Sequence, residues 1–526
     1  MKRFAQLLDG LLYQPGRNGK LRLIADYFDS APDPDRGYGL AALAGTLDLP
    51  FAKPAMLREL ITARTDPVLF LYSHDYVGDL AETIALMWPR PAGGQPRPAP
   101  LLWEVVTGLG RSKLHAPKQI ATWLDSLSAT ERWALLKLIT GGLRIGVSAR
   151  LAKTAFAEWG NVDVAEVEEL WHGLRPPYLE LFAWAEKRGP KPTPSKEAAF
   201  RPFMLSHALE DEDMAKLDAA DFIAEWKWDG IRVQAAGGPS PRLYARSGDD
   251  ISRAFPDIVE AMDFDAVLDG ELLVRGGEAD AAPFADLQQR LNRKTVTAKM
   301  LSDFPAFVRV YDVLFADGDD LRPKPWTERR AWLEEFFARR AGALNDQRFD
   351  LSPVVPFATW DELSAIRAGA RHSGMEGLML KRRDAAYVAG RPKGLWFKWK
   401  RDPHTADAVL MYAQRGHGKR SSFYSDYTFG VWKGDELVPI GKAYFGFTDA
   451  ELKLLDKWIR DNTTERFGPV RAVKPQLVLE VAFDAVQRSG RHKSGLALRF
   501  PRVSRIRWDK PAGEADHLEV VERLLN

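Results

Sequence analysis

A lysine lies between two tryptophans in the segment Glu225-Trp226-Lys227-Trp228-Asp229-Gly230-Ile231-Arg232. Apolar neighbours remove water from the Lys227 ammonium, which favours the free amine and therefore a nucleophile. Gly230 permits a tight turn and a close approach of the backbone to a nucleotide. A strand-end lysine that only covers its aromatic neighbours gives the same pattern. The segment alone therefore favours catalysis and packing equally.

Carboxylates occur in β-rich sequence at two further places. The segment from Ala266 to Leu272 contains Asp269 and Glu271, and the segment from Met375 to Lys381 contains Glu376. Carboxylates at a site of phosphoryl transfer serve mainly to hold a divalent metal ion. An ordinary hairpin or a surface segment explains each of these sequences as well, so neither identifies a site by itself.

Basic residues are concentrated locally although the net charge is only +2. Residues 371–420 contain 12 Lys and Arg against 4 Asp and Glu, and residues 491–510 contain 7 against 1. In Trp396 to Lys400, Lys398 and Lys400 fall on one face of a strand. Such clusters suit a phosphate backbone, although a run of charge is often only a solvated face.

A glycine-rich segment precedes a helical pattern in the first third of the chain. Gly141 to Val147 reads GGLRIGV, and Ser148 follows as an N-cap for a helix over Ala149 to Trp159. The N–H groups at the start of that helix would be free to bind a phosphate. A glycine-rich turn with an ordinary serine cap is the alternative.

Length and composition limit the class of protein. The 526 residues are enough for about three domains, and 45% hydrophobic with 28% charged residues is typical of a globular chain. The N-terminus lacks the apolar core of a signal peptide, and no apolar run approaches the roughly 18 residues of a membrane span. We therefore expect an intracellular protein that does not enter membranes. The absence of cysteine excludes disulfides, thiol catalysis and Cys-ligated zinc.

The chain divides into three regions by sequence pattern. Residues 1–195 read as helical, with helical spacing of apolar residues in Leu80 to Trp88 and Glu131 to Ile139. A loop is expected from Pro89 to Pro100, and the Pro-rich stretch from Arg188 to Ser195 is typical of a linker.

Residues 196–401 read as an α+β domain and residues 402–526 as a small β-barrel. In the α+β region, helices are expected over Phe284 to Leu291 and Glu328 to Arg340. The expected strands are Phe222 to Trp226, Ile231 to Gln234, Arg242 to Ala245, Ala266 to Leu268, Glu271 to Val274 and Phe307 to Leu314. The barrel is expected to contain strands Ala408 to Tyr412, Thr428 to Trp432 and Leu477 to Phe483, and one helix from Ala450 to Asn462.

The order of these segments resembles the covalent nucleotidyltransferase superfamily and, within it, the ATP-dependent DNA ligases. The matching segments are K-x-D-G at Lys227 to Gly230, the arginine motif Tyr244 to Ser247, D-G-E at Asp269 to Glu271, the aromatic motif Val310 to Leu314, E-G-L-M-x-K at Glu376 to Lys381, K-x-K at Lys398 to Lys400, and Arg499 to Lys510. Upstream, Gly141 to Val147 and Arg201 to Leu205 are similar to segments of eukaryotic and archaeal replicative-type ligases. The resemblance implies an all-α N-terminal DNA-binding domain, an α+β nucleotidyltransferase domain of the ATP-grasp-like ligase type, and a C-terminal OB-fold β-barrel.

The resemblance also implies a mechanism. Lys227 would attack the α-phosphate of ATP and retain AMP as lysyl-AMP, with release of pyrophosphate. The AMP would then move to the 5′-phosphate of a nick in duplex DNA, and the 3′-hydroxyl would displace it. Each step is an in-line phosphoryl transfer, so positioning and charge neutralisation supply most of the catalysis.

Further residue roles follow from the same resemblance. The implied nucleotide-binding residues are Glu225, Arg232, Arg246, Glu271, Tyr311, Arg382, Lys398 and Lys400, with Tyr311 stacked on the purine. Glu271 and Glu376 would hold Mg²⁺, with Mn²⁺ as an alternative. The implied pyrophosphate-orienting residues are Arg505, Arg507, Asp509 and Lys510. The implied DNA-binding residues are Gly142, Arg144, Gly146 and Ser148.

Three other functions share parts of this pattern. An NAD-dependent DNA ligase normally carries a Cys-ligated zinc module, which a chain without cysteine cannot form. An mRNA-capping guanylyltransferase or RNA ligase has the lysine motif, but the helical N-terminal region favours a DNA ligase. A non-catalytic nucleic-acid scaffold would have lost residues that are all present here. We expect a monomeric enzyme of DNA repair, replication or recombination, in a bacterial cytoplasm and associated with the nucleoid. The sequence does not show which protein partners it works with.

Overall fold

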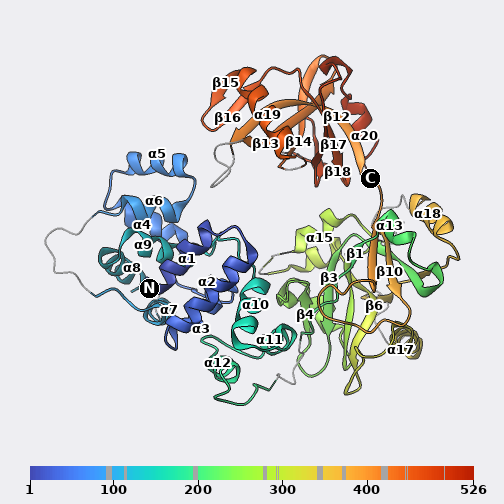
Figure 1. The fold of residues 1–526 in the computed structure, drawn as a ribbon, viewed down its shortest axis with the longest axis horizontal. Coiled ribbons are helices and arrows are strands. Elements are labelled where there is room, and N and C mark those ends of the chain that lie inside the picture. Colours follow the sequence, from blue (N-terminus) through green and yellow to red (C-terminus); the bar gives the residue numbers. More distant parts are fainter. Residues whose placement is uncertain are drawn as a thin grey trace. The chain divides into compact units, whose positions relative to one another are not determined.

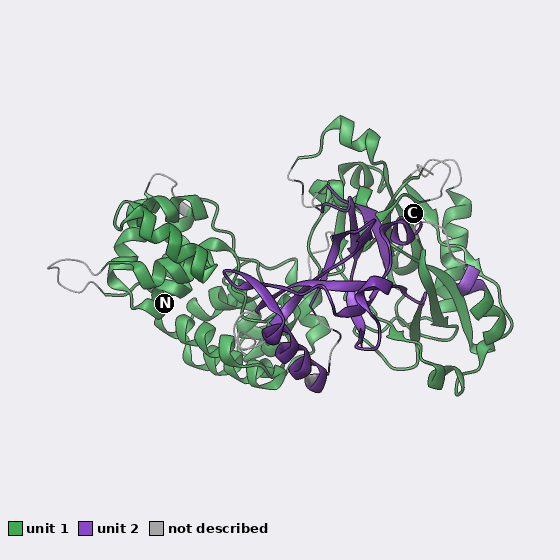
Figure 2. Cartoon of the chain, turned by 90° about the horizontal axis from the view of Figure 1, so that it is seen from above, with its two compact units in different colours: residues 1–365, 374–399 green, residues 366–373, 400–526 purple. Residues whose placement is uncertain are grey.

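The computed structural model divides into two compact units (Figure 2). The first comprises Met1–Ala365 with Gly374–Trp399, and the second comprises Ile366–Ser373 with Lys400–Asn526. The structure describes residues 1–89, 98–111, 115–193, 200–276, 281–291, 293, 295–340, 348–369, 375–415, 424–444, 446, 448–490 and 492–525. Most of the loop predicted at 89–100, and the last two residues of the linker predicted at 188–195, lie outside these ranges. The domain limits at residues 195 and 401 remain predictions.

The described part of residues 1–190 is mostly helical, as predicted (Figure 1). Their bounds are α1 Lys2–Tyr13, α2 Arg17–Ser30, α3 Asp35–Leu43, α4 Pro54–Thr62, α5 Pro67–Val77, α6 Leu80–Met87, α7 Leu102–Arg111, α8 Ala116–Ser126, α9 Ala129–Thr140, α10 Ala149–Gly160, α11 Val164–Trp171 and α12 Leu179–Ala185. Helices α6, α9 and α10 confirm the three helices expected from sequence in this region. The longest described helices, α2 and the later α17, have 14 residues. Across the described residues, no helix has both the length and the apolar character needed to cross a membrane.

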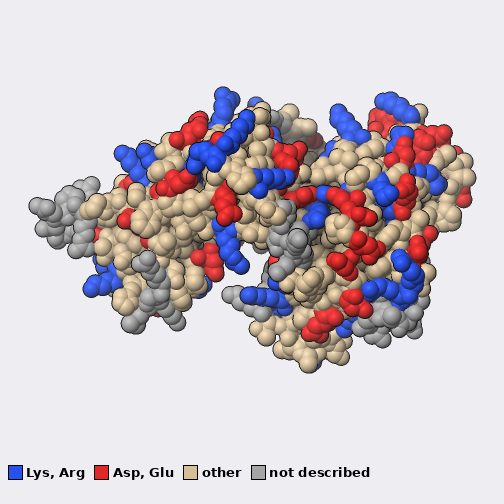
Figure 3. Space-filling model, turned by 90° about the horizontal axis from the view of Figure 1, so that it is seen from below, with Lys and Arg blue, Asp and Glu red and all other residues tan. Residues whose placement is uncertain are grey.

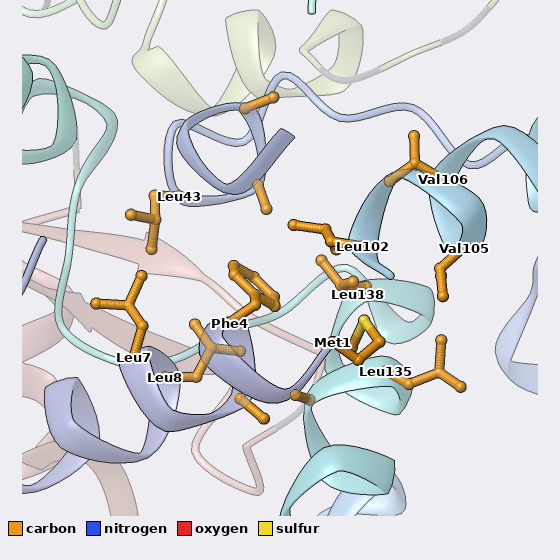
Figure 4. Close-up of a cluster of buried hydrophobic side chains, with 14 of the residues drawn as sticks. Met1, Phe4, Leu7, Leu8, Leu43, Leu102, Val105, Val106, Leu135 and Leu138 are labelled. Carbon is orange, nitrogen blue, oxygen red and sulfur yellow. The ribbon is translucent and has the colours of Figure 1, made fainter. Parts of the chain in front are cut away.

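Apolar residues at helical spacing form the core of this helical region. In α1, Phe4, Leu7, Leu8 and Leu11 are spaced at i, i+3, i+4 and i+7, and all four are buried. Figure 4 shows side chains of α1 together with residues of α3, α7 and α9, which are far apart in sequence. The helices therefore share one core and are not held only by their local propensities.

The α+β part contains two sheets. The first has the order β1-β11-β10-β2-β9, and the second has the order β4-β3-β5-β6-β7 with β8 beside β6. The bounds are β1 His207–Ala208, β2 Phe222–Trp228, β3 Ile231–Ala236, β4 Arg242–Ala245, β5 Ala266–Val274, β6 Ala306–Ala316, β7 Asp319–Asp320, β8 Phe349–Leu351, β9 Val354–Val355, β10 Met375–Arg382 and β11 Trp396–Lys400. The helices are α13 Asp211–Met214, α14 Pro256–Glu260, α15 Phe284–Arg290, α16 Ala298–Asp303, α17 Trp326–Arg339 and α18 Trp360–Gly369.

Two glycines allow the backbone to pack closely against strands β5 and β6 of the second sheet. Asp229 and Gly230 connect β2 in the first sheet to β3 in the second, and a Cβ atom on Gly230 would lie 2.4 Å from the carbonyl oxygen of Leu272. A Cβ atom on Gly270 would lie 2.7 Å from the carbonyl oxygen of Arg309. One sequence expectation is corrected: the residues predicted as two strands on either side of Asp269 and Gly270 form the single strand β5, because Gly270 continues the ladder with β6.

The second unit is mostly β-structure, as predicted for its region. Its strands are β12 His404–Arg415, β13 Tyr424–Lys433, β14 Glu436–Ala443, β15 Thr463–Phe467, β16 Val470–Val473, β17 Val478–Phe483, β18 Ala485–Arg488, β19 Leu496–Arg499 and β20 Arg502–Arg507, and its helices are α19 Asp449–Asp461 and α20 Leu518–Glu522. The long strand β12 pairs with β13, β16 and β17, and β17 also pairs with β20. Buried apolar residues of these strands form one common core.

Candidate active site

Lys227 is the penultimate residue of β2 and is hydrogen-bonded to Glu376 of the neighbouring strand β10. Its Nζ atom donates to Glu376 Oε2 at 2.6 Å, and the two side chains are 23% and 21% exposed. The β2–β10 register shifts between Met375 and Gly377, so Glu376 is the extra residue of a β-bulge. Gly377 has φ = 141°, a value that a residue with a side chain rarely adopts. The glycine of the E-G-L-M segment therefore directs Glu376 toward Lys227.

The tryptophans beside Lys227 do not form its surroundings, which corrects the expectation from sequence. Successive side chains of a strand point to opposite faces, so Trp226 and Trp228 face away from Lys227. Trp228 is buried, with its Nε1 atom donating to Ser352 Oγ at 3.2 Å and the Arg309 guanidinium 4.2 Å from its ring. The ammonium of Lys227 is therefore paired with a carboxylate, whereas Trp228 packs elsewhere.

Glu271, on β5 of the second sheet, is a second carboxylate close enough to Lys227 for their charges to interact. Burial raises the pKa of Glu271 to about 8; the charges of Lys227 and Arg232 oppose this rise, and those of Glu376 and Asp269 increase it. A carboxyl group of this kind remains protonated at neutral pH unless a cation binds beside it.

Glu225 lies two residues before Lys227 and forms a buried ion pair with Lys381. The Lys381 Nζ atom is 2.7 Å from Glu225 Oε2, and the side chains are 1% and 2% exposed. Arg330 lies 3.5 Å from Glu225 Oε1, but that oxygen accepts no hydrogen bond from the described residues. Burial raises the pKa of Glu225, while the charge of Lys381 acts in the opposite direction.

Lys381 also fixes the backbone and the ring of Tyr311. Its Nζ atom donates to the Tyr311 carbonyl oxygen at 3.0 Å and lies 4.5 Å from the centroid of the Tyr311 ring. Sequence analysis gave no role to Lys381 or Arg330. The E-G-L-M-x-K motif contained the signal for Lys381, whereas no sequence signal pointed to Arg330.

Arg232 is held within the protein. Its guanidinium donates to both carboxylate oxygens of Asp269, at 3.1 and 2.7 Å, and to the carbonyl oxygen of Met204 at 2.7 Å. The same group lies 5.8 Å from the Tyr311 ring. The hydrogen bonds of Arg232 therefore go to protein groups. They hold its guanidinium near the ring of Tyr311.

The remaining predicted nucleotide-binding residues lie in different parts of the fold. Arg246 is exposed just after β4, where partial burial and the charges of Arg232 and Arg391 lower its pKa. Lys398 lies half-buried on β11, the strand beside β10. Lys400 belongs to the second unit and lies 3.5 Å from Asp484. The structure does not bring Arg382 to Lys227, because its guanidinium is exposed and pairs with Asp384 at 2.7 Å.

The turn predicted to bind DNA leads into α10 as expected. Gly141 ends α9 in the left-handed conformation, Arg144 and Gly146 have φ values of 51° and 66°, and Ser148 Oγ accepts from the Leu151 N–H at 3.1 Å. The start of α10 and Arg246 line one cavity of about 1030 Å³. Its basic lining residues are Arg150, Arg246, Arg253 and Arg293.

The predicted pyrophosphate-orienting residues cluster within the second unit. Lys510 Nζ lies 2.8 Å from Asp407 Oδ2, and the Arg507 guanidinium lies 3.3 Å from the same oxygen. Arg507 also donates to Asp509, which lowers the pKa of that carboxyl to about 2. Arg505 is exposed on β20 opposite Glu480.

No metal cage made of protein side chains alone is present in the described ranges: no three His, Asp or Glu side chains converge there. Glu271 and Glu376 are the carboxylates beside Lys227. Two carboxylates suit Mg²⁺, which commonly takes its other ligands from water and substrate phosphates.

Comparison with known sequences shows the family. Residues 203–400 match the profile of the "ATP dependent DNA ligase domain", and residues 420–510 match that of the "ATP dependent DNA ligase C terminal region". A "Probable DNA ligase" of Koribacter versatilis is 38% identical over 429 residues, which cover 77% of this chain and 74% of the relative. The chain belongs to the ATP-dependent DNA ligase family.

Two further comparisons are consistent with this assignment. A "Probable DNA ligase" of Anaeromyxobacter sp. is 34% identical to this ligase over 77% of its chain and 78% of the relative. The solved structure "Pmar-Lig_PreS3" covers 96% of this ligase and 99% of its own chain, with a TM-score of 0.58 and 16% identity, which supports the fold alone. The prediction of an ATP-dependent, nick-sealing DNA ligase is therefore confirmed over the NAD-dependent, RNA-directed and non-catalytic alternatives.

Proposed function

We propose that this ligase carries AMP on Lys227 between ATP and the 5′-phosphate of a nick. The observation that supports this role best is the 2.6 Å hydrogen bond from Lys227 Nζ to Glu376. The nitrogen lone pair attacks the α-phosphorus of ATP, the bond to the β-phosphate oxygen breaks, and pyrophosphate leaves. Glu376 is positioned to accept the proton that the amine must lose before attack. The 5′-phosphate oxygen then displaces Lys227, and the 3′-hydroxyl finally displaces AMP.

Adenine is proposed to bind between Glu225 and Tyr311. Glu225 Oε1 is a buried acceptor that lacks a hydrogen bond within the described residues, and an exocyclic amine would supply one. The ring of Tyr311 is held by Lys381 on one side and supported by Arg232, so it is ordered before a base stacks on it. Stacking on an aromatic ring contributes about 1–3 kcal/mol per base. These contacts favour adenine over guanine, which carries no amine at the same position.

Glu271 and Glu376 are proposed to hold Mg²⁺ together with ATP phosphates, with Mn²⁺ as an alternative. The raised pKa of Glu271 supports this proposal, because a cation would compensate a buried charge that the free protein disfavours. A divalent ion at this position would neutralise charge on the transferring phosphate.

Cationic side chains are proposed to bind the phosphates. Arg246 and Lys398, with Lys400, would contact the α-phosphate and the nick, and Arg232 would act by supporting Tyr311. In the second unit, Arg505, Arg507, Asp509 and Lys510 would orient the pyrophosphate during the first step. Arg507 and Lys510 already share Asp407, so their charges are ordered before the triphosphate arrives.

DNA contact is proposed at the turn before α10 and in the adjoining cavity. Gly142, Arg144, Gly146 and Ser148 would contact backbone phosphates through N–H groups, a hydroxyl group and one guanidinium. Lys and Arg are interspersed with Asp and Glu on the face shown in Figure 3. On this face, DNA would therefore be attracted by local phosphate contacts and not by one continuous basic surface.

The finer architecture and setting are also part of the proposal. The limits 1–195, 196–401 and 402–526 would define a helical DNA-binding domain, an ATP-grasp-like nucleotidyltransferase domain and an OB-fold barrel. The pairing of β12 with three partner strands, and the apolar core that they share, support the barrel. The ligase would act as a monomer in a bacterial cytoplasm on nucleoid DNA; the bacterial source of the relatives supports this setting.

The test is a stepwise assay with α-labelled ATP. The wild-type chain should form a labelled covalent adduct and transfer the label to a 5′-phosphorylated nick, whereas Lys227→Arg should form no adduct. GTP and NAD should not replace ATP. A labelled Lys227→Arg protein, or labelling by NAD with a rate equal to that of ATP, would contradict the proposal.

A further inference from the structure

The turn between α9 and α10 adopts a backbone conformation that requires support from elsewhere. Arg144 has φ = 51° and Gly146 has φ = 66°. A non-glycine residue in the left-handed region is uncommon and is maintained by its surroundings. Gly146 is exposed on one side of the turn. The groups that hold the turn must therefore contact it from the side that faces the protein.

Lys20 of α2 supplies that support. Its Nζ atom donates to the carbonyl oxygens of Ile145 and Gly146, each at 2.8 Å. Lys20 is 9% exposed, and none of the carboxylates in the described ranges pairs with its ammonium. A Cβ atom on Gly146 would lie 2.4 Å from Lys20 Nζ, so the lysine packs directly against the turn.

The position of Lys20 determines where the N–H groups of the turn point. These peptide bonds are trans, and in a trans peptide the carbonyl and the following N–H point in opposite directions. Because the two carbonyls point inward to Lys20, the N–H groups of Gly146 and Val147 point away from it. Neither group donates to an acceptor in the part of the chain that the structure describes.

Nearby positive charges favour an anion beside the N–H groups of Gly146 and Val147. The ammonium of Lys20 binds the carbonyl of Gly146, two residues before Ser148, which is the N-cap of the 12-residue helix α10. The N-terminus of such a helix carries partial positive charge. A buried cation without a carboxylate partner beside a helix N-terminus is unfavourable in the free protein. A bound phosphate would relieve this repulsion, which couples anion binding to the ordered turn.

We propose that Lys20 is a positioning residue for DNA binding: it holds the turn at residues 144–147 so that the N–H groups of Gly146 and Val147 face a backbone phosphate. This inference rests on the DNA contact proposed above for Arg144 and Gly146. Lys20 itself contacts the turn, and it acts on DNA through the turn and through its charge.

The experiment measures binding of the full chain to a nicked duplex whose 3′ end lacks the hydroxyl and so cannot be sealed. Lys20→Met should raise the Kd about tenfold, since an ammonium that bonds two carbonyls is lost. The rate of adenylation by ATP without DNA should stay unchanged. On a sealable nick, the KM for DNA should rise while kcat at saturating DNA stays the same. Arg22→Met is the control, because it removes the same charge from an exposed site on the same helix.

A second variant keeps the test decisive if Lys20→Met unfolds. Gly146→Ala would place its methyl group against the ammonium and should weaken DNA binding as well. The double variant Lys20→Met/Gly146→Ala should bind no more weakly than Gly146→Ala alone, because the two changes disrupt the same contact. A Kd for Lys20→Met within twofold of that for Arg22→Met, or additive effects in the double variant, would overturn the inference. Unchanged binding by Arg144→Ala would instead contradict the proposed DNA contact itself.

Discussion

Glu376 accepts a hydrogen bond from Lys227 at 2.6 Å because β10 carries one extra residue at that point. In a regular antiparallel ladder a one-residue change of register moves a side chain to the opposite face. The bulge, with Gly377 at φ = 141°, places a carboxylate beside the amine at the end of β2. The pairing of Lys227 with Glu376 therefore depends on backbone geometry more than on the tryptophans that flank Lys227.

Glu376→Gln should slow adenylation of Lys227 by about a hundredfold, because the amide keeps the shape of the side chain but accepts a proton poorly. The rate of adduct formation at saturating ATP measures this effect. Glu335→Gln is a suitable control, since Glu335 is exposed on α17 and pairs only with Arg339 among the contacts described. Equal rates of adduct formation in the two variants would show that Glu376 does not accept the proton.

Metal binding should depend on pH through Glu271. Its pKa in the folded protein is about 8, so the carboxyl group is protonated below that pH and a cation must displace the proton. Mn²⁺ affinity, followed by electron paramagnetic resonance, should therefore rise by about tenfold per pH unit from pH 6 toward pH 8 and level off above it. Glu271→Gln should bind the ion weakly at every pH; a wild-type affinity independent of pH would contradict the role of Glu271.

The same shift affects stability in a defined direction. Between the unfolded value of 4.5 and the folded value of about 8, the folded state binds a proton that the unfolded state has lost. The contribution of Glu271 to stability is therefore present below pH 4.5 and is lost as pH rises toward 8. Denaturant titrations without metal measure the free energy of unfolding at each pH. This free energy should fall less between pH 4.5 and pH 8 in Glu271→Gln than in the wild-type chain.

Lys381→Met should lower the free energy of unfolding by about 3–5 kcal/mol, since it leaves Glu225 buried without its nearest cation. Lys324→Met provides the comparison, because the Lys324–Glu328 pair is more than half exposed and should contribute less than about 1 kcal/mol. Urea unfolding of both variants measures the difference. If Lys381→Met lost no more stability than Lys324→Met, the buried pair would not be the support of Tyr311 described here.

Gly230→Ala should destabilise the chain and reduce adenylation, because the added methyl group would meet the Leu272 carbonyl at 2.4 Å. Gly110→Ala is the matched control: Gly110 lies within α7, and an added Cβ there meets nothing within 4 Å. The control should be neutral or stabilised by roughly 1 kcal/mol. Thermal unfolding of both variants checks the contrast, and a Gly230→Ala protein as stable as the control would show that the connection between β2 and β3 can move away from β5 without cost.

Sequence patterns predicted the helical, α+β and β-rich regions because apolar periodicity and glycine or proline breaks are local features. They also selected Lys227, Glu271, Glu376 and Tyr311, which lie in short motifs. Contacts between residues far apart in the sequence could not be predicted from such local patterns. Periodicity could not show that a bulge directs Glu376 toward Lys227. It also could not show that the Arg382 guanidinium forms an ion pair with Asp384. Lys20 lies 125 residues before its partner Ile145, and no pattern around it indicates the contact.

The position of the adenylate decides whether Lys227 carries AMP. The wild-type chain is treated with ATP and magnesium, digested, and examined by tandem mass spectrometry under conditions that preserve the acid-labile phosphorus–nitrogen bond. We expect one AMP on the peptide that contains Lys227, assigned to that side chain, and its loss after nicked DNA is added. An adenylate on any other residue, or one on Lys227 that nicked DNA does not remove, would contradict this expectation.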